Sequence, residues 1–365
     1  MKIAWLSNFS ILGSGYKHIS VPLCEGLTNA GHEVKAIGID YDGSEHWFNF
    51  QLLPARNMQE ATGILSNLAQ KWGVDILVVA LDIPLQLQLL KILKPRPFKY
   101  IGIMPVEADP LLMDWAILMN EMDWAYIISD FGAKEAKKAG VIKSEHLQIG
   151  VDTDAWKRTT VDARTQFRKA LGISEDEKVI LTVAHNYERK NITLAMDIVS
   201  KVKEKYDKVR YILVTKEQHA FGWNIMDYAR KVGISSNLMI FERGIDFSKL
   251  WGLYSISDVF LLSSKAEGLS LPILEAMSVG IPVVATNCTA MVDHLQDGRG
   301  YLVDYEYTHI DCFGNGKRYW ISPEDGAEKV ITALESGTEV VEKAYEYVKG
   351  RKWSDAVNQM DSKIR

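Results

Sequence analysis

The chain has 365 residues, of which 47% are hydrophobic and 24% charged, and its formal net charge is −5. This length suits two domains, and the acidic balance argues against a nucleic-acid-binding protein, which would usually be basic. No apolar run reaches about 18 residues, so no transmembrane helix is expected, and three scattered cysteines fit a reducing cytoplasm.

The first half of the chain alternates strand-like and helix-like segments. Residues 2–8 form an apolar strand without the basic region and long apolar core of a secretory signal, so none is expected. A loop with glycines follows, then an amphipathic helix at 16–31. Further strand-like runs lie at 32–40, 75–82, 99–107, 124–130 and 146–152. Such alternation predicts a mostly parallel sheet with helices on both faces.

A polar, charged stretch at 150–178 separates this half from a second one with the same pattern. We place the boundary between residues 157 and 158, which gives an acceptor-side domain at 1–157 and a donor-binding domain at 158–344. The second set of strand-like runs lies at 179–184, 210–215, 238–243, 258–264, 282–287 and 300–304. The C-terminal segment is predicted to be helical, and its last helix, about 345–365, to pack back on the first domain.

The most informative stretch runs from Asp258 to Asn287 and predicts a strand, a loop, a helix and a strand. Ser270 is expected to cap the helix, with Pro272 in its first turn, and Gly280 to end it. Ligands of such units sit at the carboxyl ends of strands, beside helix N-termini that favour phosphate.

Two glutamates border this loop and helix start. Glu267 lies in the loop and Glu275 early in the helix, so both carboxylates can face one crevice. A ligand with a diphosphate between two groups rich in hydroxyls would suit them. A simpler alternative is that the glutamates serve helix capping and the helix dipole alone.

The sequence "SDVFLLSSKAEGLSLPILEAMSVGIPVVATN" closely resembles the signature of the family 4 retaining glycosyltransferases, in which two glutamates separated by seven residues flank the donor site. Other segments agree with this resemblance: "NFSILGSGYKHISVPLCEGLTNAGHEV", "IGVDTDAW", "AHNYERKN", "LGISEDEKVILTVA" and "KWSDAV". The resemblance spans nearly the whole chain. It implies the GT-B fold, two doubly wound Rossmann-like α/β domains that face each other across a cleft.

The resemblance assigns roles to the residues around the two glutamates. Glu275 would accept hydrogen bonds from the ribose hydroxyls of a sugar nucleotide, and Glu267 would contact hydroxyls of the transferred sugar. The backbone amides that would bind sugar and phosphate oxygens are those of Gly268, Leu269, Ser270 and Leu271.

A basic loop would stabilise the diphosphate that leaves. Lys190 is the best candidate, with Arg189 beside it, and the alternative is a solvated basic turn. The family usually has an arginine where this chain has His185, which weakens diphosphate binding unless Arg189 substitutes. Gly13 and Gly15 would let the backbone of the first domain approach the diphosphate.

Other candidates are less specific. Arg243 and Gly244, in the segment 241–246, are expected beside the nucleobase. Glu107 and Asp109 are candidates for contact with the sugar or acceptor, although Glu107 equally suits a helix start. His18 could face the acceptor, and a surface histidine is the simpler interpretation.

No metal or other cofactor is expected. Asp40 and Asp42, in "DYD", resemble the metal-binding triplet of transferases with a different fold, but an acidic turn after the second strand is the better interpretation. We expect a nucleotide sugar (UDP-, GDP- or ADP-linked) as substrate and no required metal.

The resulting hypothesis is a cytoplasmic enzyme of carbohydrate or glycoconjugate biosynthesis. It would transfer a hexose, with retention, to a hydroxyl acceptor on a glycan, a lipid or a small molecule. A nucleotide-sugar epimerase or hydrolase and a non-catalytic sugar-nucleotide-binding protein are the alternatives. The basic stretch 91–99 fits peripheral contact with the inner face of a membrane, and equally a crossover helix with a solvated edge.

Overall fold

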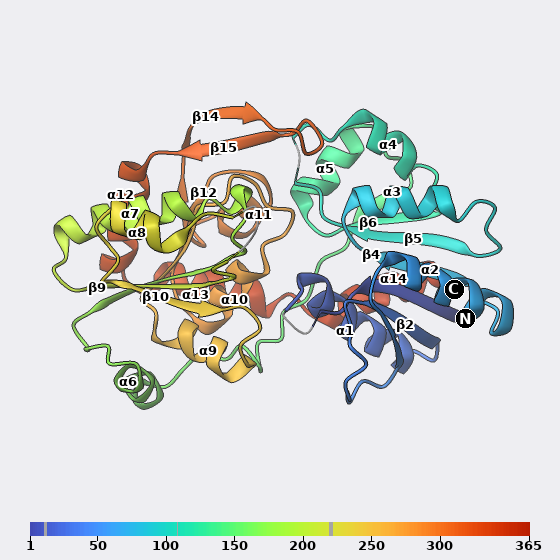
Figure 1. Ribbon diagram of the computed structural model, residues 1–365, viewed down its shortest axis with the longest axis horizontal. Coiled ribbons are helices and arrows are strands. Elements are labelled where there is room, and N and C mark those ends of the chain that lie inside the picture. The colour runs from blue at the N-terminus through green and yellow to red at the C-terminus, as the bar shows by residue number, and fades with distance from the viewer. Residues whose placement is uncertain (11–12, 108, 219–221) are drawn as a thin grey trace. The chain divides into compact units, whose positions relative to one another are not determined.

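The computed structural model describes residues 1–10, 13–107, 109–218 and 222–365, so residues 11–12 of the glycine loop and residue 108 beside Glu107 lie outside it. The chain forms two compact units (Figure 1). Unit 1 comprises Met1–Gly150, Cys312–Gly316 and Arg351–Arg365, and unit 2 comprises Val151–Asp311 and Lys317–Gly350.

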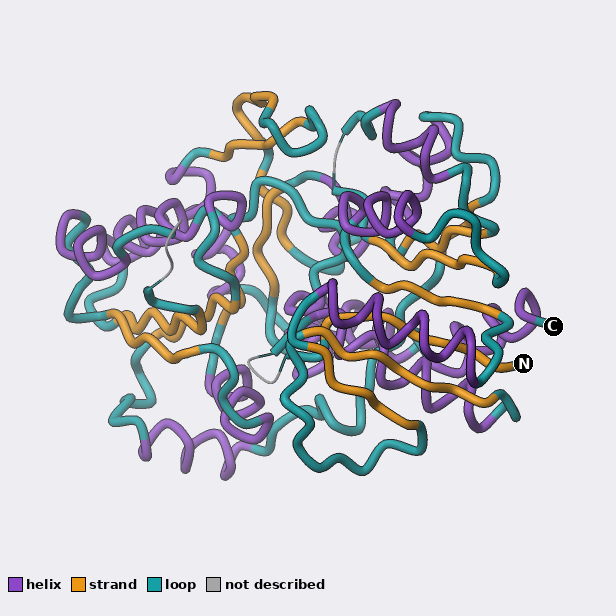
Figure 2. The backbone as a smooth tube through the Cα atoms, turned by 45° about the vertical axis from the view of Figure 1, so that its right-hand side comes forward, coloured by secondary structure: helices purple, strands orange, loops and turns teal. Residues whose placement is uncertain are grey.

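Unit 1 is built on a parallel sheet with the strand order β3-β2-β1-β4-β5-β6-β7 (orange in Figure 2). The strands are β1 Lys2–Asn8, β2 Glu33–Ile39, β3 Gln51–Ala55, β4 Ile76–Ala80, β5 Lys99–Met104, β6 Trp124–Ile127 and β7 Ser144–His146. The helices are α1 Gly15–Asn29, α2 Met58–Lys71, α3 Ile83–Ile92, α4 Met113–Met119, α5 Asp130–Lys138 and α14 Trp353–Ile364.

Unit 2 has a parallel sheet with the order β10-β9-β8-β11-β12-β13 and a separate antiparallel hairpin, β14-β15. The strands are β8 Lys178–Val183, β9 Val209–Thr215, β10 Leu238–Glu242, β11 Val259–Leu262, β12 Val283–Thr286, β13 Tyr301–Val303, β14 Tyr305–Ile310 and β15 Lys317–Ile321. The helices are α6 Val161–Ala170, η1 Glu188–Lys190, α7 Ile192–Lys205, α8 Ile225–Lys231, α9 Phe247–Ile256, α10 Leu271–Val279, α11 Thr289–Leu295, α12 Pro323–Glu335 and α13 Glu339–Lys349.

The central strands are apolar throughout because helices cover both of their faces. Every residue of β4 and of β11 is buried. In unit 1 one core cluster joins the sheet to α2, α3, α4 and α5. In unit 2 the corresponding cluster joins the sheet to α7, α8 and α12, while α9, α10 and α13 pack together on the opposite face (Figure 1). The predicted doubly wound α/β architecture is therefore confirmed.

Some elements differ from the sequence predictions. The run at 146–152 is not a strand over that range, since β7 spans only Ser144–His146. The edge strand β3 and the hairpin β14-β15 were not predicted. The C-terminal segment forms three helices, because Ser336 and Lys352, in extended conformations, interrupt it.

The contacts of the linker place the division between the units at residues 150 and 151, upstream of the predicted boundary. The ring of Trp156 packs edge-on against Phe247 and Tyr254, with centroids 4.9 and 5.3 Å apart. Ser278 also donates a hydrogen bond to the Trp156 carbonyl, at 2.8 Å. The start of the linker is thus part of unit 2. At the other end, α13 lies in unit 2 and α14 in unit 1.

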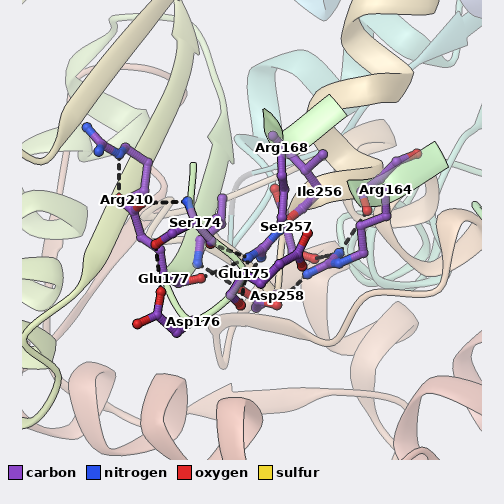
Figure 3. A network of polar contacts seen from close by, with 12 residues as sticks. Arg164, Arg168, Ser174, Glu175, Asp176, Glu177, Arg210, Ile256, Ser257 and Asp258 are labelled. Carbon is purple, nitrogen blue, oxygen red and sulfur yellow. Dashed lines mark hydrogen bonds and ion pairs between the residues drawn. The ribbon is translucent and has the colours of Figure 1, made fainter. Parts of the chain in front are cut away.

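A polar network lies at the amino edge of the unit 2 sheet (Figure 3). Asp258, just before β11, accepts hydrogen bonds from Arg164 at 2.5 Å and from Arg168 at 2.8 Å. Arg168 is almost fully buried and also donates to the carbonyls of Ile256 and Glu177. This network fixes α6 against the sheet.

Both sheets reverse their strand order between two central strands. The reversal lies between β1 and β4 in unit 1, and between β8 and β11 in unit 2. In doubly wound sheets the loops that leave the carboxyl ends of these two strands part to opposite sides and leave room for a ligand. The loops after β8 and β11 contain the predicted basic residues and Glu267.

Candidate active site

Backbone and side-chain hydrogen bonds join the two loops at the reversal in unit 2. The amide of Lys265 donates to the carbonyl of Arg189 at 2.8 Å, and the Ser263 hydroxyl donates to the carbonyl of Asn191 at 2.9 Å. Asn191 itself has a left-handed backbone conformation, with φ 52°, between η1 and α7. The loop after β8 is thereby held alongside the loop after β11.

Glu267 lies where these loops meet and is buried, with 4% of its surface exposed. Its carboxylate pairs with Lys190 Nζ at 2.5 Å and with an Arg189 guanidinium nitrogen at 3.2 Å. Burial alone would raise the pKa of this carboxyl, but the two cations outweigh burial and lower the pKa to about 2. Three of the four side chains that the sequence suggests as catalytic therefore form one ionised cluster in which two cations share one carboxylate, while the fourth, Glu107, belongs to unit 1.

A strained threonine fixes the backbone of Glu267. Thr289 has a φ of 48°, which is unusual for a β-branched residue. Its hydroxyl accepts a hydrogen bond from the Glu267 amide at 2.8 Å, and the next amide, of Ala290, donates to the Glu267 carbonyl at 3.2 Å. Strain of this kind persists only where the surrounding structure enforces it, and it is common at functional sites.

The loop Gly268–Ser270 leads into α10, which begins at Leu271 and has proline in its first turn, as expected. Ser270 occupies the N-cap position, but the prediction that its side chain caps the helix is wrong. Its φ of 69° turns the hydroxyl away from the first-turn amides, and no side-chain cap forms. Ser270 is buried, with 7% of its surface exposed, and its hydroxyl has no hydrogen-bond partner among the described residues, so a donor or acceptor of a ligand could satisfy it.

A histidine that the sequence analysis missed holds this loop. His294 of α11 is buried, and its Nε2 lies 2.6 Å from the Leu269 carbonyl oxygen. The other ring nitrogen, Nδ1, lies 3.1 Å from the Tyr347 hydroxyl. Because a carbonyl can only accept, Nε2 carries a proton, and the tyrosine hydroxyl can donate to Nδ1. The imidazole thus links α13 to the residue before Ser270.

Glu275 faces a different environment from Glu267. It is half-buried, and its carboxylate accepts a hydrogen bond from the buried Tyr254 hydroxyl at 2.7 Å. Burial raises the pKa of Glu275 to about 7, although Tyr254 and the charge of Arg243 act against the rise. The predicted residue Arg243 is thus close enough to act on Glu275, and the adjacent Gly244 has a φ of 87°.

Lys265 joins the hairpin β14-β15 to the same loop. Its ammonium lies 3.6 Å from the centre of the Trp320 ring and pairs with Glu188. Burial is the main cause that lowers its pKa to about 8. The Lys265 carbonyl also accepts a hydrogen bond from the Tyr319 amide at 3.0 Å. Nothing in the spacing of the sequence indicated this connection.

His185, in place of the expected arginine, lies at the start of the loop after β8. Its ring stacks on Tyr187 with centroids 4.4 Å apart and an angle of 17° between the planes. The loop is therefore stiffened by an aromatic contact at a position where the resemblance would imply the permanent charge of an arginine.

The candidates of unit 1 lie at the carboxyl edge of its own sheet. Gly13 has a φ of 85°, and Gly15 begins α1, whose Tyr16 hydroxyl lies 2.5 Å from Asp82 at the end of β4. Glu107 and Asp82 border one small hollow of about 10 Å³, together with Trp115 and Phe313. His18 is exposed on α1, as expected of a surface histidine.

The acidic residues of "DYD" have local partners. Asp40 accepts a hydrogen bond from Asn8 at 2.7 Å, and Asp42 accepts one from the Ser44 amide at 2.9 Å. Within the described ranges, no three His, Cys, Asp or Glu side chains are grouped as metal ligands would be. The same ranges contain no helix with the length and apolar character needed to cross a bilayer.

Known proteins share this fold. The Anabaena protein HepE, solved in complex with UDP-glucose, superimposes with a TM-score of 0.78 at 14% identity, covering 100% of this chain and 98% of HepE. At this identity the likeness shows the GT-B fold alone.

Curated relatives match shorter stretches. The GDP-mannose-dependent alpha-(1-6)-phosphatidylinositol monomannoside mannosyltransferase of Mycolicibacterium smegmatis is 26% identical over 168 residues, which are 44% of this chain and 43% of that protein. The lipopolysaccharide glucosyltransferase WaaG of Escherichia coli (strain K12) is 23% identical over 136 residues, 37% of this chain and 35% of WaaG. The chain thus spans less than half the length of each.

A family model described as "Glycosyl transferases group 1" matches residues 163–348, just over half of the chain and nearly all of unit 2. The matched residues include both glutamates, the basic loop after β8 and the histidine of α11. This protein belongs to the group 1 glycosyl transferases.

Proposed function

We propose that this protein is a family 4 retaining glycosyltransferase that transfers a hexose from a nucleotide-diphosphate sugar to a hydroxyl acceptor without a metal. The observation that carries the proposal is the cluster of Glu267, Lys190 and Arg189 at the strand reversal of unit 2. Two cations and one carboxylate leave the cluster with one positive charge, beside the N-terminus of α10. A diphosphate is the ligand that this charge and these amides favour.

The two glutamates have different tasks in this scheme. Glu267 remains ionised at any ordinary pH, so its oxygens accept hydrogen bonds from hydroxyls of the transferred sugar. Glu275, eight residues later, accepts them from the ribose hydroxyls when it is ionised. The Ser270 hydroxyl and the amides of residues 268–271 bind sugar and phosphate oxygens, and His294 keeps the loop in place.

The chemical step exchanges one bond at the anomeric carbon for another on the same face of the sugar. The bond from that carbon to the phosphate oxygen breaks, and the diphosphate leaves with its electron pair. Lys190 and Arg189 stabilise the growing negative charge. The acceptor hydroxyl forms the new bond, and its proton passes to the departing phosphate, which needs no separate base.

Relatives support a nucleotide sugar and leave the base open. The name of the mycobacterial relative specifies GDP-mannose, and HepE was solved with UDP-glucose. We therefore test UDP-, GDP-, ADP- and dTDP-linked sugars by calorimetric titration, with the native chain and Glu275→Ala. One nucleotide class should bind tightly and lose affinity in the variant. A folded chain that binds none of the four would refute the proposed donor site.

Product analysis completes the test. With the donor identified, proton NMR of the glycoside should show the anomeric configuration of the donor, and activity should survive EDTA. Inverted product, or activity lost in EDTA and restored by Mg²⁺, would contradict the mechanism. Conversion of the donor without an acceptor and without release of nucleoside diphosphate would indicate an epimerase.

For the proposed cytoplasmic enzyme, fewer basic side chains are available for contact with a membrane than the sequence suggests. In the basic stretch 91–99, Lys94 pairs with Glu121, and Arg96 pairs with Asp123 at 3.1 Å. The charges of Lys91 and Lys99 then have to supply most of the attraction to an anionic surface. Co-sedimentation with anionic liposomes measures it, and no binding would remove membrane contact from the proposal.

A further inference from the structure

A cavity of about 520 Å³ lies in unit 1, away from every residue assigned a role above. It is formed by the loop 40–50, which joins β2 to β3, and by residues of the edge strand β3 (dark blue in Figure 1). Its volume falls within the range of small-molecule sites. The loop leaves the carboxyl end of β2, and this is the edge of a doubly wound sheet at which ligands bind.

Trp47 stands at this cavity with 98% of its surface exposed. Large aromatic side chains are usually well buried, because their burial contributes strongly to stability. Because its side chain is exposed, Trp47 contributes almost no buried surface to the stability of unit 1. A ring that a protein keeps in solvent beside a cavity is available to a ligand.

Residues 42–49 of the loop around Trp47 are all exposed or half-buried, but aromatic contacts order part of it. His46, Phe48 and Phe50 form a stack, with 4.7 Å between the first two ring centroids and 5.2 Å between the last two. Phe50 is buried at its base. Tyr41, also buried, donates a hydrogen bond to the Ser44 carbonyl. These contacts hold the loop while Trp47 points away from the stack.

The charge around the cavity restricts the ligand. Residues 36–55 include Asp40, Asp42 and Glu45 and no lysine or arginine; Glu45 lines the cavity, and Lys17 of α1 is a nearby cation that acts on Asp42. The carboxylates outnumber this lysine, so the local charge disfavours a phosphate or an anionic lipid surface. Carboxylates accept hydrogen bonds from hydroxyl groups, and the flat indole offers an apolar face. A neutral sugar ring combines both partners, with its hydroxyls at the rim and its C–H bonds on one face.

We propose that this cavity binds a neutral sugar unit of the acceptor, with Trp47 stacked on the ring and Glu45 accepting hydrogen bonds from its hydroxyls. That this sugar belongs to the acceptor rests on the proposed function, in which unit 2 binds the donor. The carbohydrate site itself rests on the cavity, the exposed indole and the local charge alone. It implies an acceptor that is itself a glycan or a glycoconjugate.

The test compares the native chain with Trp47→Ala, Trp47→Phe and, as a control, Ile142→Ala. Ile142 is another exposed apolar side chain of unit 1, at 79%. All variants should melt at the native temperature and bind the nucleotide sugar like the native chain. Saturation-transfer NMR with glucose, galactose, mannose and N-acetylglucosamine, and an array of neutral oligosaccharides, then report carbohydrate binding.

We expect Trp47→Ala to weaken binding of the best glycan about fivefold to tenfold, Trp47→Phe to weaken it less, and the control to leave it unchanged. No Trp47-dependent binding of any neutral sugar overturns the proposal. So does binding to phosphatidylcholine or phosphatidylglycerol vesicles that depends on Trp47, which would make the loop a membrane contact.

The two proposals fail separately. A chain that binds a nucleotide sugar but shows no Trp47-dependent glycan binding keeps its proposed function and loses this site. A chain that binds glycans through Trp47 but no nucleotide sugar keeps the carbohydrate site and loses the transferase proposal.

Discussion

Unit 2 has two clusters of cations around a carboxylate, at opposite edges of one sheet, and they differ in what else the cations contact. At the amino edge, Arg168 donates to four backbone carbonyls besides Asp258, so the protein itself supplies its acceptors. At the carboxyl edge, Lys190 and Arg189 share the side chain of Glu267 next to a helix start without a side-chain cap, and Arg189 also donates to the Ala266 carbonyl at 2.5 Å. The Glu267 side chain is buried, with 5% exposed, whereas the Asp258 side chain is 25% exposed. We infer from the comparison that the number of backbone acceptors and the edge of the sheet distinguish structural charges from those that we propose to bind a ligand.

The largest expected effect is the loss of stability on breaking the amino-edge network. Asp258→Asn removes the charge that pairs with the buried Arg168, and should cost about 3 kcal/mol of the free energy of unfolding of unit 2. Urea unfolding followed by circular dichroism measures it. Asp227→Asn, which breaks an exposed pair with Arg230, is the control and should cost less than about 0.5 kcal/mol. Equal effects of the two substitutions would refute the structural assignment.

The carboxyl-edge cluster should affect catalysis as well as stability. Lys190→Ala removes a cation from the proposed diphosphate site and should lower kcat about 10²-fold to 10³-fold. It also leaves the buried Glu267 with only Arg189 of its two ion-pair partners, so the melting temperature should fall too, and kcat is compared at a temperature at which the variant is folded. The control is Lys205→Ala, because Lys205 pairs with Glu335 at the same distance of 2.5 Å but on the surface. A kcat that stays native in Lys190→Ala would place catalysis elsewhere.

A smaller effect should follow from loosening the loop between the two glutamates. His294→Leu removes the hydrogen bond to the Leu269 carbonyl and should weaken nucleotide-sugar binding about tenfold, since a buried acceptor is left unsatisfied. Hydrogen exchange at residues 268–271 should become faster in the free protein. Tyr347→Phe keeps the imidazole and removes only its hydroxyl partner, so it should show a weaker form of both changes. Unchanged exchange in His294→Leu would exclude a positioning role.

The smallest expected effect is a change of nucleotide-sugar affinity with pH, which depends on Glu275 and not on Glu267. Glu275 binds ribose hydroxyls best as a carboxylate, and its pKa is about 7, so nucleotide-sugar affinity should rise severalfold between pH 6 and 8. Calorimetry at several pH values measures it, and a flat profile would contradict it. Glu267, with a pKa of about 2, should not contribute in this range.

The contribution of Glu275 to the stability of the fold should change with pH in the opposite direction to the nucleotide-sugar affinity. Because folding raises the pKa of Glu275, its contribution to stability is complete below its unfolded value near 4.5 and is lost as the pH rises through about 7. Glu275→Gln should therefore melt higher than the native chain at pH 8 by more than it does at pH 5. A difference that is the same at both pH values would argue against a raised pKa.

Local patterns made much of the fold predictable. Runs such as 259–262 are apolar at every position because helices cover both faces of the strand. The glutamate pair and the start of α10 were also predictable, since loop, proline and helix follow one another within a few residues. The edge strand β3 was not predicted because it is short and contains Pro54. Strand β14 was not predicted because none of its residues is buried, so no apolar face marks it in the sequence.

The parts of the site that could not be predicted depend on contacts between distant residues. Tyr254 reaches Glu275 across 21 positions, and His294 reaches Leu269 across 25. No spacing rule connects such pairs, because elements that are apart in the sequence bring them together: α9 and α10 in the first case, α11 and the loop before α10 in the second. Ser270 shows the same limit on a small scale. Its residue type is a good cap, but the backbone that leaves Glu267 forces a φ of 69°.

The route of the chain gives unit 1 an unusual dependence on its last helix. Gly26 of α1 approaches α14 so closely that a β-carbon at this glycine would lie 2.3 Å from Val357, and His32 contacts Asp361 at 2.6 Å. During synthesis, the contacts that Gly26 and His32 make with α14 therefore form only after residues 351–365 are made, while unit 2 leaves the ribosome nearly complete. The domain made first should be the last to finish folding, the reverse of the usual vectorial order. Protease sensitivity of ribosome-bound chains that end at Gly350 would reveal this order, and resistance of residues 1–150 in them would disprove it.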